Sequence, residues 1–293
     1  MKNSRRSAIK KIAGNAAMLT AAGSVFNRLN ASDKILDEKT KGALSHSVCK
    51  WCYNDIPLED LCKASEKLGL SSIELLGPND WETLQKYGLT CAMGNGAEIS
   101  LTEGFNHTEH HDQLVKNYSE IIPIAAKAGI KNVICFSGNR KGMDDETGMI
   151  NSAKGLRKLM PLAEQHGVTL VMELLNSKVN HRDYQCDHTA WGSALCEMVG
   201  SERFKLLYDI YHMQIMEGDV IATIKKFNPY IAHYHTGGVP GRNEIDESQE
   251  LYYPAIMKAI AETGFKGFVA QEFIPKREDK LASLKQGIDI CNI

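Results

Sequence analysis

The stretch LLYDIYHMQIMEGD, residues 206–219, contains the pattern on which the fold assignment depends. An apolar run, residues 204–208, predicts a buried strand, and Asp209 follows it directly, with His212 three residues later. Parallel α/β barrels place ionisable side chains in this way, because their active sites lie at the carboxyl ends of the strands. If the fold is such a barrel, the same pattern must recur along the chain.

Short apolar runs and helical stretches alternate from residue 43 onward. The predicted strands are 43–51, 71–77, 89–96, 131–138, 168–176, 204–210, 230–238 and 266–273, and the predicted helices are 57–69, 79–88, 110–129, 146–166, 190–199, 218–227, 251–263 and 279–290. Repeated strand–helix units with glycine after the helices imply parallel strands and right-handed crossovers. Eight such units in about 250 residues predict a single (β/α)8 TIM barrel over residues 44–293.

The composition supports a folded α/β enzyme and gives no sign of a nucleic-acid partner. Hydrophobic residues make up 43% and charged residues 24% of the 293 positions, and the formal net charge is −2. These values are typical of globular domains, and no basic footprint is present. A doubly wound sheet is the competing fold, but the first predicted strand is followed by no glycine-rich phosphate loop.

The first 32 residues have the composition of an export signal. They contain basic residues and no acidic one, and Ser4-Arg5-Arg6-Ser7-Ala8-Ile9-Lys10 resembles the twin-arginine pattern, with alanine where that pattern prefers phenylalanine. The apolar stretch 12–26 is too short and too polar for a stable membrane span, which needs about 20 apolar residues. We therefore predict export to the periplasm; the alternative is an attached basic amphipathic helix on a cytoplasmic protein.

Eight cysteines invite a disulfide framework, but we predict structural thiols. A chain of this length does not need covalent cross-links, and several of the cysteines lie inside apolar runs. Cys49 and Cys52 resemble a redox or zinc pair. On one continuous strand, with a rise of about 3.3 Å per residue, they would lie too far apart for a disulfide.

Four consecutive predicted strands end in a group that can bind a metal. These groups are Glu173, Asp209, His235 and Glu272, at intervals of 36, 26 and 37 residues. Three carboxylates and one imidazole suit a single divalent ion, Mn, Co, Mg or Zn, and a cation would also relieve the repulsion between the carboxylates. Each residue alone is more often a helix cap or an ion-pair partner. His233 lies one pleat before His235, so alternation leaves open which imidazole faces the site.

The chain resembles the hydroxypyruvate isomerases, a group within the xylose isomerase-like, AP endonuclease family 2 type, barrel superfamily. The motifs that carry the resemblance are YDIYHMQIMEGD, VPGR (Val239–Arg242) and QEF (271–273). The resemblance implies a metal held by the four residues above, with Glu173 and Glu272 as the acid/base pair. It also implies that His212 and Arg242 bind substrate oxygens and that the protein forms a homodimer or tetramer.

Two of these assignments have structural alternatives. Arg242 could form a salt bridge within its loop, with Glu244 or Asp246, and His212 could be a hydrogen-bonded core histidine. The loop after the predicted strand 168–176 contains His181 and either covers the pocket or lies on the surface.

The implied chemistry is proton transfer through an enediolate on a small hydroxy-carbonyl or sugar substrate, for example hydroxypyruvate to tartronate semialdehyde. Hydroxypyruvate isomerases tend to carry glutamine where this chain has His235, whereas ketose 3-epimerases carry histidine. The alternatives are therefore a periplasmic ketose 3-epimerase, a lyase or hydrolase acting on 3-keto-sugars, and a sugar-binding barrel without activity.

Overall fold

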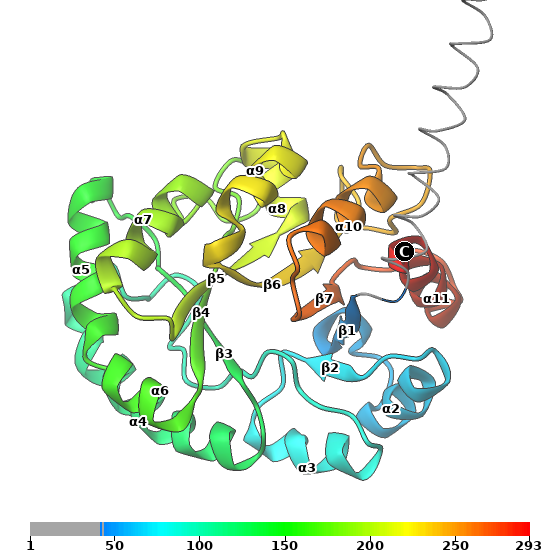
Figure 1. The fold of residues 1–293 in the computed structure, drawn as a ribbon, viewed down its shortest axis with the longest axis horizontal. Coiled ribbons are helices and arrows are strands. Elements are labelled where there is room, and N and C mark those ends of the chain that lie inside the picture. Colours follow the sequence, from blue (N-terminus) through cyan, green and yellow to red (C-terminus); the bar gives the residue numbers. More distant parts are fainter. Residues whose placement is uncertain (1–41, 43) are drawn as a thin grey trace, which may run out of the picture.

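Parallel strands curl around a common axis and form the centre of the fold (Figure 1). The structure, a computed structural model, describes residue 42 and residues 44–293, so the predicted export signal, 1–32, lies outside the described residues. The strands are β1 Ser45–Cys49, β2 Ser72–Glu74, β3 Asn132–Cys135, β4 Thr169–Glu173, β5 Phe204–Asp209, β6 Ile231–Thr236 and β7 Phe268–Gln271. They pair in parallel in the order β2-β1-β7-β6-β5-β4-β3, which confirms the predicted fold class.

The strand predicted at 89–96 is not formed as a continuous strand, and that prediction is wrong. The segment instead bridges β2 and β3 through isolated contacts, Leu76 with Gly94 and Gly94 with Val133. The amide of Gly94 donates to the carbonyl of Asn132 at 2.9 Å, and its own carbonyl accepts from Ile134 at 2.9 Å. Residues 90–94 therefore occupy the position of the missing strand with only a few ladder hydrogen bonds.

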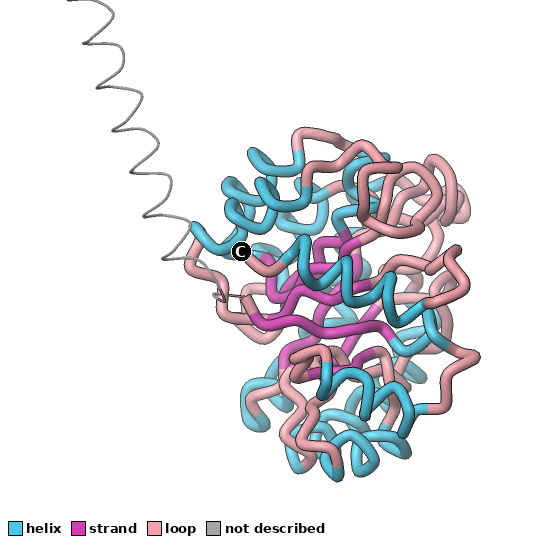
Figure 2. The backbone as a smooth tube through the Cα atoms, turned by 90° about the vertical axis from the view of Figure 1, so that its right-hand side faces the viewer, coloured by secondary structure: helices cyan, strands magenta, loops and turns pink. Residues whose placement is uncertain are grey.

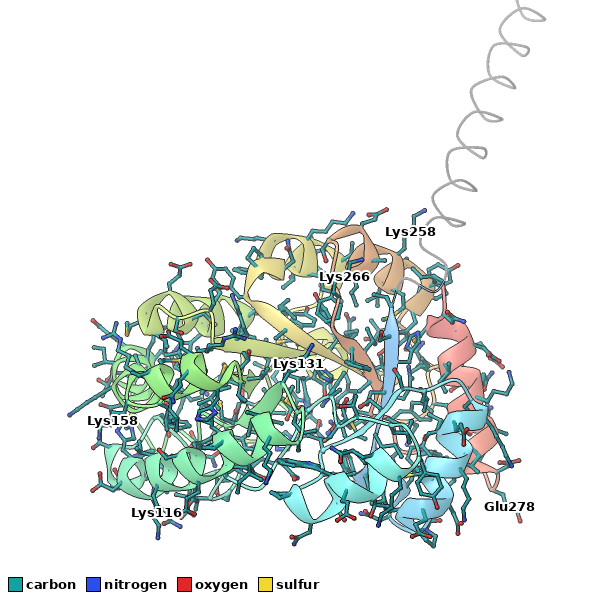
Figure 3. The ribbon with its side chains drawn as sticks, turned by 60° about the horizontal axis from the view of Figure 1, so that its bottom comes forward. Lys116, Lys131, Lys158, Lys258, Lys266 and Glu278 are labelled. Atoms are coloured by element: carbon teal, nitrogen blue, oxygen red, sulfur yellow. The ribbon has the colours of Figure 1, made fainter. Side chains whose placement is uncertain are left out.

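Helices surround the strands on the outside (Figures 1 and 2). They are α2 Leu58–Lys67, α3 Pro78–Lys86, α4 His111–Lys127, α5 Asp145–Arg157, α6 Met160–His166, α7 Thr189–Val199, α8 Ile210–Met216, α9 Val220–Phe227, α10 Tyr253–Glu262 and α11 Lys280–Cys291, with short 3₁₀ turns η1 Lys50–Tyr53, η2 Thr108–His110 and η3 Asn228–Tyr230. Charged side chains such as Lys116 and Lys158 project outward from this layer (Figure 3). Within the described part of the chain, no helix has the length and apolar character of a bilayer span.

Two helical predictions differ from the structure in detail. The helix predicted at 146–166 is interrupted between α5 and α6, where Pro161 lies in the first turn of the second helix. Proline lacks an N–H and fits the first turn of a helix, so it favours a new start over continuation. The stretch after Asp209 forms a separate short helix, α8, before the predicted helix at 218–227.

The residues after β1 also differ from the prediction, which continued the strand to residue 51. Lys50–Tyr53 form the 3₁₀ turn η1, so Cys49 and Cys52 are not consecutive strand residues and the distance argument against pairing them does not apply. All eight cysteines are nevertheless buried free thiols. Burial raises the pKa of both Cys49 and Cys52 well above the ordinary value, as expected for unreactive structural thiols.

The two faces of the strands have different surroundings. The large apolar core packs the outward-facing residues of the strands against the helices. A small inner cluster, Met93, Ile134, Val171 and Leu207, fills the inside of the barrel. Glu173 and Asp209 follow Val171 and Leu207 by two residues, so they lie on the same inner face, one layer nearer the carboxyl ends of the strands.

The buried His46 in β1 predicts a pH dependence of stability. It is 8% exposed, neither ring nitrogen has a hydrogen-bond partner among residues 44–293, and burial lowers its pKa to about 4, against about 6.5 in an unfolded chain. The unfolded state binds the proton more readily, so this contribution is fully present above about pH 6.5 and is lost as the pH falls toward about 4.

We expect the free energy of unfolding of the wild type to fall relative to that of His46→Leu by roughly 3 kcal/mol between pH 7.5 and pH 4. Urea denaturation of both proteins across this range measures the difference. Parallel pH profiles would contradict the prediction.

Candidate active site

The four residues predicted to bind a metal converge at the carboxyl ends of neighbouring strands. Glu173 ends β4, Asp209 ends β5, His235 lies near the end of β6, and Glu272 directly follows β7. One ligand atom from each of the four lies within 4.8 Å of every other. Their convergence follows from the sheet order, because β4, β5, β6 and β7 are adjacent.

Within this set, the carboxylate oxygens outnumber the hydrogen-bond donors that they contact. His235 Nδ1 lies 2.8 Å from Glu272 Oε2 and 3.4 Å from Glu173 Oε1. All of these side chains are buried, and Glu173 Oε1 has no hydrogen-bond partner among the described residues. A buried carboxylate oxygen without a donor is costly. The set therefore presents an oxygen and imidazole environment that suits a divalent cation.

Arg242 points into the site and not along its own loop. Its Nη2 lies 3.1 Å from Asp209 Oδ2 and also pairs with Glu272 Oε2. The guanidinium stacks between two aromatic rings, 5.1 Å from the centre of Trp51 and 5.5 Å from that of Tyr211. These contacts hold a planar cation beside two carboxylates, where it can also reach a substrate oxygen.

The salt bridge considered for Arg242 within its loop is not formed. Asp246 pairs with Arg277, and Glu244 accepts hydrogen bonds from Ser283 and from backbone amides. Arg242 itself has a positive φ of 58°, a backbone conformation that is rare for a side chain of this size. The loop thus holds Arg242 in an uncommon conformation that directs it to the carboxylates.

His212 lies in α8 behind Asp209. The Asp209 carboxylate caps this helix, accepting from the amides of Tyr211 at 2.8 Å and His212 at 3.2 Å. His212 Nδ1 accepts from the backbone amide of Asn176 at 3.2 Å, which leaves the proton on Nε2. That Nε2 is buried, has no hydrogen-bond partner and lies 3.6 Å from Asp209 Oδ2. His212 is not part of the cavity wall, so substrate binding by this residue remains a prediction.

A cavity of about 360 Å³ opens beside the four residues. Of these four, only Glu173 and Glu272 line it, together with Arg242. Trp51 Nε1 donates to Glu272 Oε1 at 2.8 Å and fixes that carboxylate at the cavity wall. The two glutamates predicted as the acid/base pair are therefore the members of the set that a ligand in the cavity would meet.

The rest of the cavity lining is largely apolar. It is formed by Leu75, Leu101, Ile134, Phe136 and Leu175, with Asn95 and Glu98 as its polar members. His181, from the loop after β4, also lines the cavity, so this loop contributes one residue to the pocket wall. Apolar walls exclude water from a polar reaction centre and strengthen its electrostatic interactions.

The environment separates the pKa values of the carboxyl groups. Burial raises the pKa of Glu173 above its ordinary value and that of Asp209 to about 8. Burial acts in the same direction on Glu272, but Arg242 and His235 more than offset it and hold its pKa well below the ordinary value. Burial and the Arg242 charge lower the pKa of His212. Carboxyl groups with pKa values moved apart are typical of acid/base sites.

Sequence reasoning missed Glu74, the last residue of β2. It is fully buried, and its Oε1 lies 2.8 Å from His233 Nε2 and 2.9 Å from His235 Nε2. Both histidines are therefore on the inner side, and the question left open by strand alternation is answered: His235 contacts Glu173 and Glu272, whereas His233 contacts Glu74 and the edge of the His235 ring. Glu74 ends an apolar strand as Glu173 does, so the same signal could have found it.

Comparison with protein families identifies a barrel family that covers most of the chain. The family model described as Xylose isomerase-like TIM barrel matches residues 63–292.

The curated relatives that match this chain are named as isomerases. A human protein provisionally named hydroxypyruvate isomerase is 30% identical over 123 residues, 42% of this chain and 44% of that protein. The 2-oxo-tetronate isomerase of Cupriavidus necator is 34% identical over 114 residues, 39% and 43% of the two chains. The chain thus matches less than half the length of these two relatives. The 2-oxo-tetronate isomerase of Pectobacterium atrosepticum is 24% identical over 242 residues, 78% of this chain and 92% of that protein.

Solved structures share the fold at low sequence identity. The AP endonuclease, family 2, from Brucella melitensis superposes with a TM-score of 0.72 at 22% identity, covering 84% of this chain and 96% of that one. The IOLI protein, solved with a bound zinc atom, superposes with a TM-score of 0.66 at 15% identity, covering 85% and 98%.

Proposed function

This chain belongs to the xylose isomerase-like TIM barrel family, and from its site we propose that it is a metal-dependent isomerase of small hydroxy-carbonyl compounds. The observation that carries the proposal is the pair of carboxylates, Glu173 and Glu272, that line one cavity beside a buried set of metal-type ligands. The names of the relatives, hydroxypyruvate isomerase and 2-oxo-tetronate isomerase, support the same reaction class.

The residues present fit a divalent cation. Glu173, Asp209, His235 and Glu272 would hold it, since their ligand atoms converge and the buried Glu173 Oε1 has no hydrogen-bond partner in the described part of the chain. When bound, such a cation polarises the carbonyl and hydroxyl oxygens of a substrate and so acidifies the neighbouring C–H. The neighbour with bound zinc shows that this fold can hold a metal.

The side chains of the chain supply the proton transfers. Glu173 would take the proton from the carbon beside the carbonyl, because burial raises its pKa and makes it the better base of the pair. Glu272, held ionised by Arg242, would exchange protons with the substrate oxygen or the adjacent carbon. Arg242 would donate hydrogen bonds to the developing oxyanion, and the apolar wall would exclude water.

Proton exchange in heavy water tests this function. We expect the Mn²⁺-loaded or Co²⁺-loaded protein to exchange the C–H beside the carbonyl of hydroxypyruvate or 2-oxo-tetronate and to form the isomer, and metal removal by a chelator to abolish both. NMR follows exchange and product together. Metal binding without exchange on any hydroxy-carbonyl compound would favour a sugar-binding barrel, and bond cleavage would favour a lyase.

A ketose 3-epimerase is the second candidate, and the cavity wall favours it. Among the described residues that line the cavity, Arg242 is the only permanent cation, and it is already paired with two carboxylates. Asn95 and Glu98 on the far side suit hydroxyl groups better than a substrate carboxylate. If the protein inverted one carbon of a ketohexose and did not exchange the C–H protons of 2-oxo acids, the result would support the epimerase over the isomerase.

We also propose that the protein is exported and acts in the periplasm. The support is the twin-arginine-like composition of residues 1–32 alone. Assembly into homo-oligomers is likewise a proposal that rests on the family resemblance.

A further inference from the structure

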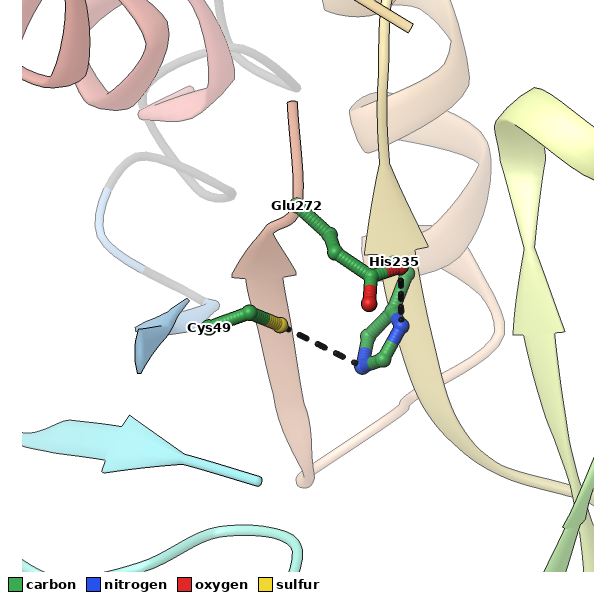
Figure 4. Close-up of side chains that lie close together, drawn as sticks. All are labelled: Cys49, His235 and Glu272. Atoms are coloured by element: carbon green, nitrogen blue, oxygen red, sulfur yellow. Dashed lines mark hydrogen bonds and ion pairs between the residues drawn. The ribbon is translucent and has the colours of Figure 1, made fainter. Parts of the chain in front are cut away.

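A second buried polar cluster surrounds the far side of the His235 ring. Figure 4 shows Cys49 and Glu272 near the two nitrogens of this imidazole, with Cys49 Sγ 3.8 Å from Nε2 and Glu272 Oε2 2.8 Å from Nδ1. Glu74 Oε1 lies 2.9 Å from the same Nε2. The ring therefore has two distinct sides: Nδ1 faces the metal-type carboxylates, and Nε2 faces Glu74 in the barrel interior.

The contacts of Glu74 determine which nitrogen of His235 carries the proton. Its Oε1 also lies 2.8 Å from Nε2 of His233, so one oxygen lies between two imidazole nitrogens. A carboxylate accepts hydrogen bonds and does not donate them, so each Nε2 must be the donor. Glu272 Oε2 lies 2.8 Å from Nδ1, so by the same rule the metal-free ring donates from both nitrogens. A cation that replaced the Nδ1 proton would leave neutral His235 with its proton on Nε2 and its lone pair on Nδ1, the nitrogen that faces Glu173 and Glu272.

The surroundings hold Glu74 in this place. The carboxylate and both imidazoles are completely buried, so water does not compete for these hydrogen bonds. The next residue, Leu75, has a positive φ of 56°, and its side chain turns to the cavity wall while Glu74 stays beneath it. A bulky residue rarely adopts this conformation, and such exceptions gather at functional positions.

We propose that Glu74 is a positioning residue that holds His235 as the Nε2–H tautomer, with Nδ1 presented as the metal-binding atom. His233 acts on the same carboxylate: its Nε2 also donates to Glu74 Oε1, and its ring packs edge-on against that of His235. The proposal rests on the proposed metal-dependent function for its role in activity, but the tautomer is a property of the chain itself. Ligating histidines in proteins are generally oriented in this way by a carboxylate or carbonyl on the other ring nitrogen.

Nitrogen-15 NMR of the imidazoles gives the direct test on the wild-type protein. We expect a proton on Nε2 of both His235 and His233, in the metal-free and the zinc-loaded protein. An unprotonated Nε2 on His235 overturns the proposal, whatever the variants do. This measurement also separates the positioning role of Glu74 from the proposed metal-dependent function. If the wild-type protein bound no metal, the proposed function would be refuted, but the position of the proton on His235 would still test the role of Glu74.

Cobalt binding by variants gives the second test. We expect Glu74→Gln to weaken Co²⁺ binding by 10-fold to 100-fold, the range seen for such supporting residues, and to change the visible spectrum of bound Co²⁺. Glu74→Asp keeps the charge but shortens the side chain, so it should not restore affinity if hydrogen-bond position matters. Glu98→Gln removes a carboxylate at the cavity wall that does not contact His235 and should leave the affinity unchanged. Equal affinity in Glu74→Gln and wild type, or full rescue by Glu74→Asp, would refute positioning.

Discussion

Replacement of Glu173 by glutamine is expected to lower kcat for isomerisation by about a thousandfold or more while the barrel remains folded. Glutamine has nearly the same shape, but its amide cannot take a proton from carbon, and general-base catalysis typically contributes 10²- to 10⁴-fold. Glu173 is 5% exposed, lines the cavity, and has an oxygen with no competing hydrogen-bond partner. Steady-state kinetics and deuterium exchange at saturating metal measure the loss, and circular dichroism reports the fold.

Glu120→Gln is the matched control for this experiment. It makes the same chemical change at an exposed position of α4, outside the cavity lining and the metal-type set. We expect its kcat to stay within a few-fold of wild type. If Glu173→Gln retained more than about a tenth of the wild-type rate at equal metal content, Glu173 would not be the base.

The second large effect is expected from Asp209→Asn, which should remove the metal without removing the helix cap. Asp209 Oδ1 accepts the amides of Tyr211 and His212 at the start of α8, and an asparagine oxygen can do the same. The other oxygen, Oδ2, faces the Arg242 guanidinium and the metal-type set. We expect about one divalent ion per wild-type chain and under a tenth in the variant, measured by elemental analysis after dialysis.

Asp209→Ala separates the two roles of this residue. It should lose the metal as Asp209→Asn does and, in addition, lose about 1 kcal/mol of stability in the metal-free protein, because the cap disappears. Denaturant titration of the metal-free wild type and both variants tests this. Full metal content in Asp209→Asn would contradict the ligand assignment.

Much of the site could be predicted because, in a parallel barrel, residues at the carboxyl ends of neighbouring strands lie close together in space. Glu173, Asp209 and Glu272 each follow a buried apolar run, and adjacent parallel strands bring the ends of such runs to one rim. Family membership, inferred from three short motifs, is confirmed by the family model that covers residues 63–292. The direction of Arg242 could not be predicted, since it depends on the positive φ of one loop residue and on two aromatic rings distant in sequence.

The failures have physical causes that local sequence does not show. Residues 89–96 have the composition of a strand, but the chain makes only isolated bridges there, because pairing depends on how β2 and β3 approach each other. The strand predicted at 43–51 was drawn too long, because its sequence does not show the turn at Lys50–Tyr53. This turn places Trp51 within hydrogen-bond distance of Glu272. Glu74 could have been found from its position at a strand end, but its pairing could not, because its partners, His233 and His235, lie some 160 positions away in the chain.

The partial pairing of residues 90–94 has a consequence for how this barrel can diversify. The groups that would carry out the chemistry lie at the ends of β4 to β7, which pair along their length, whereas most of the apolar wall, all but Leu175, lies on, between or directly after β2 and β3. Substitutions and insertions in residues 95–101, which directly follow that loosely paired segment, would reshape the wall and leave the proton-transfer groups in place. One reaction type could therefore persist through evolution while the range of accepted molecules changes, and an engineer seeking new selectivity should begin at residues 95–101.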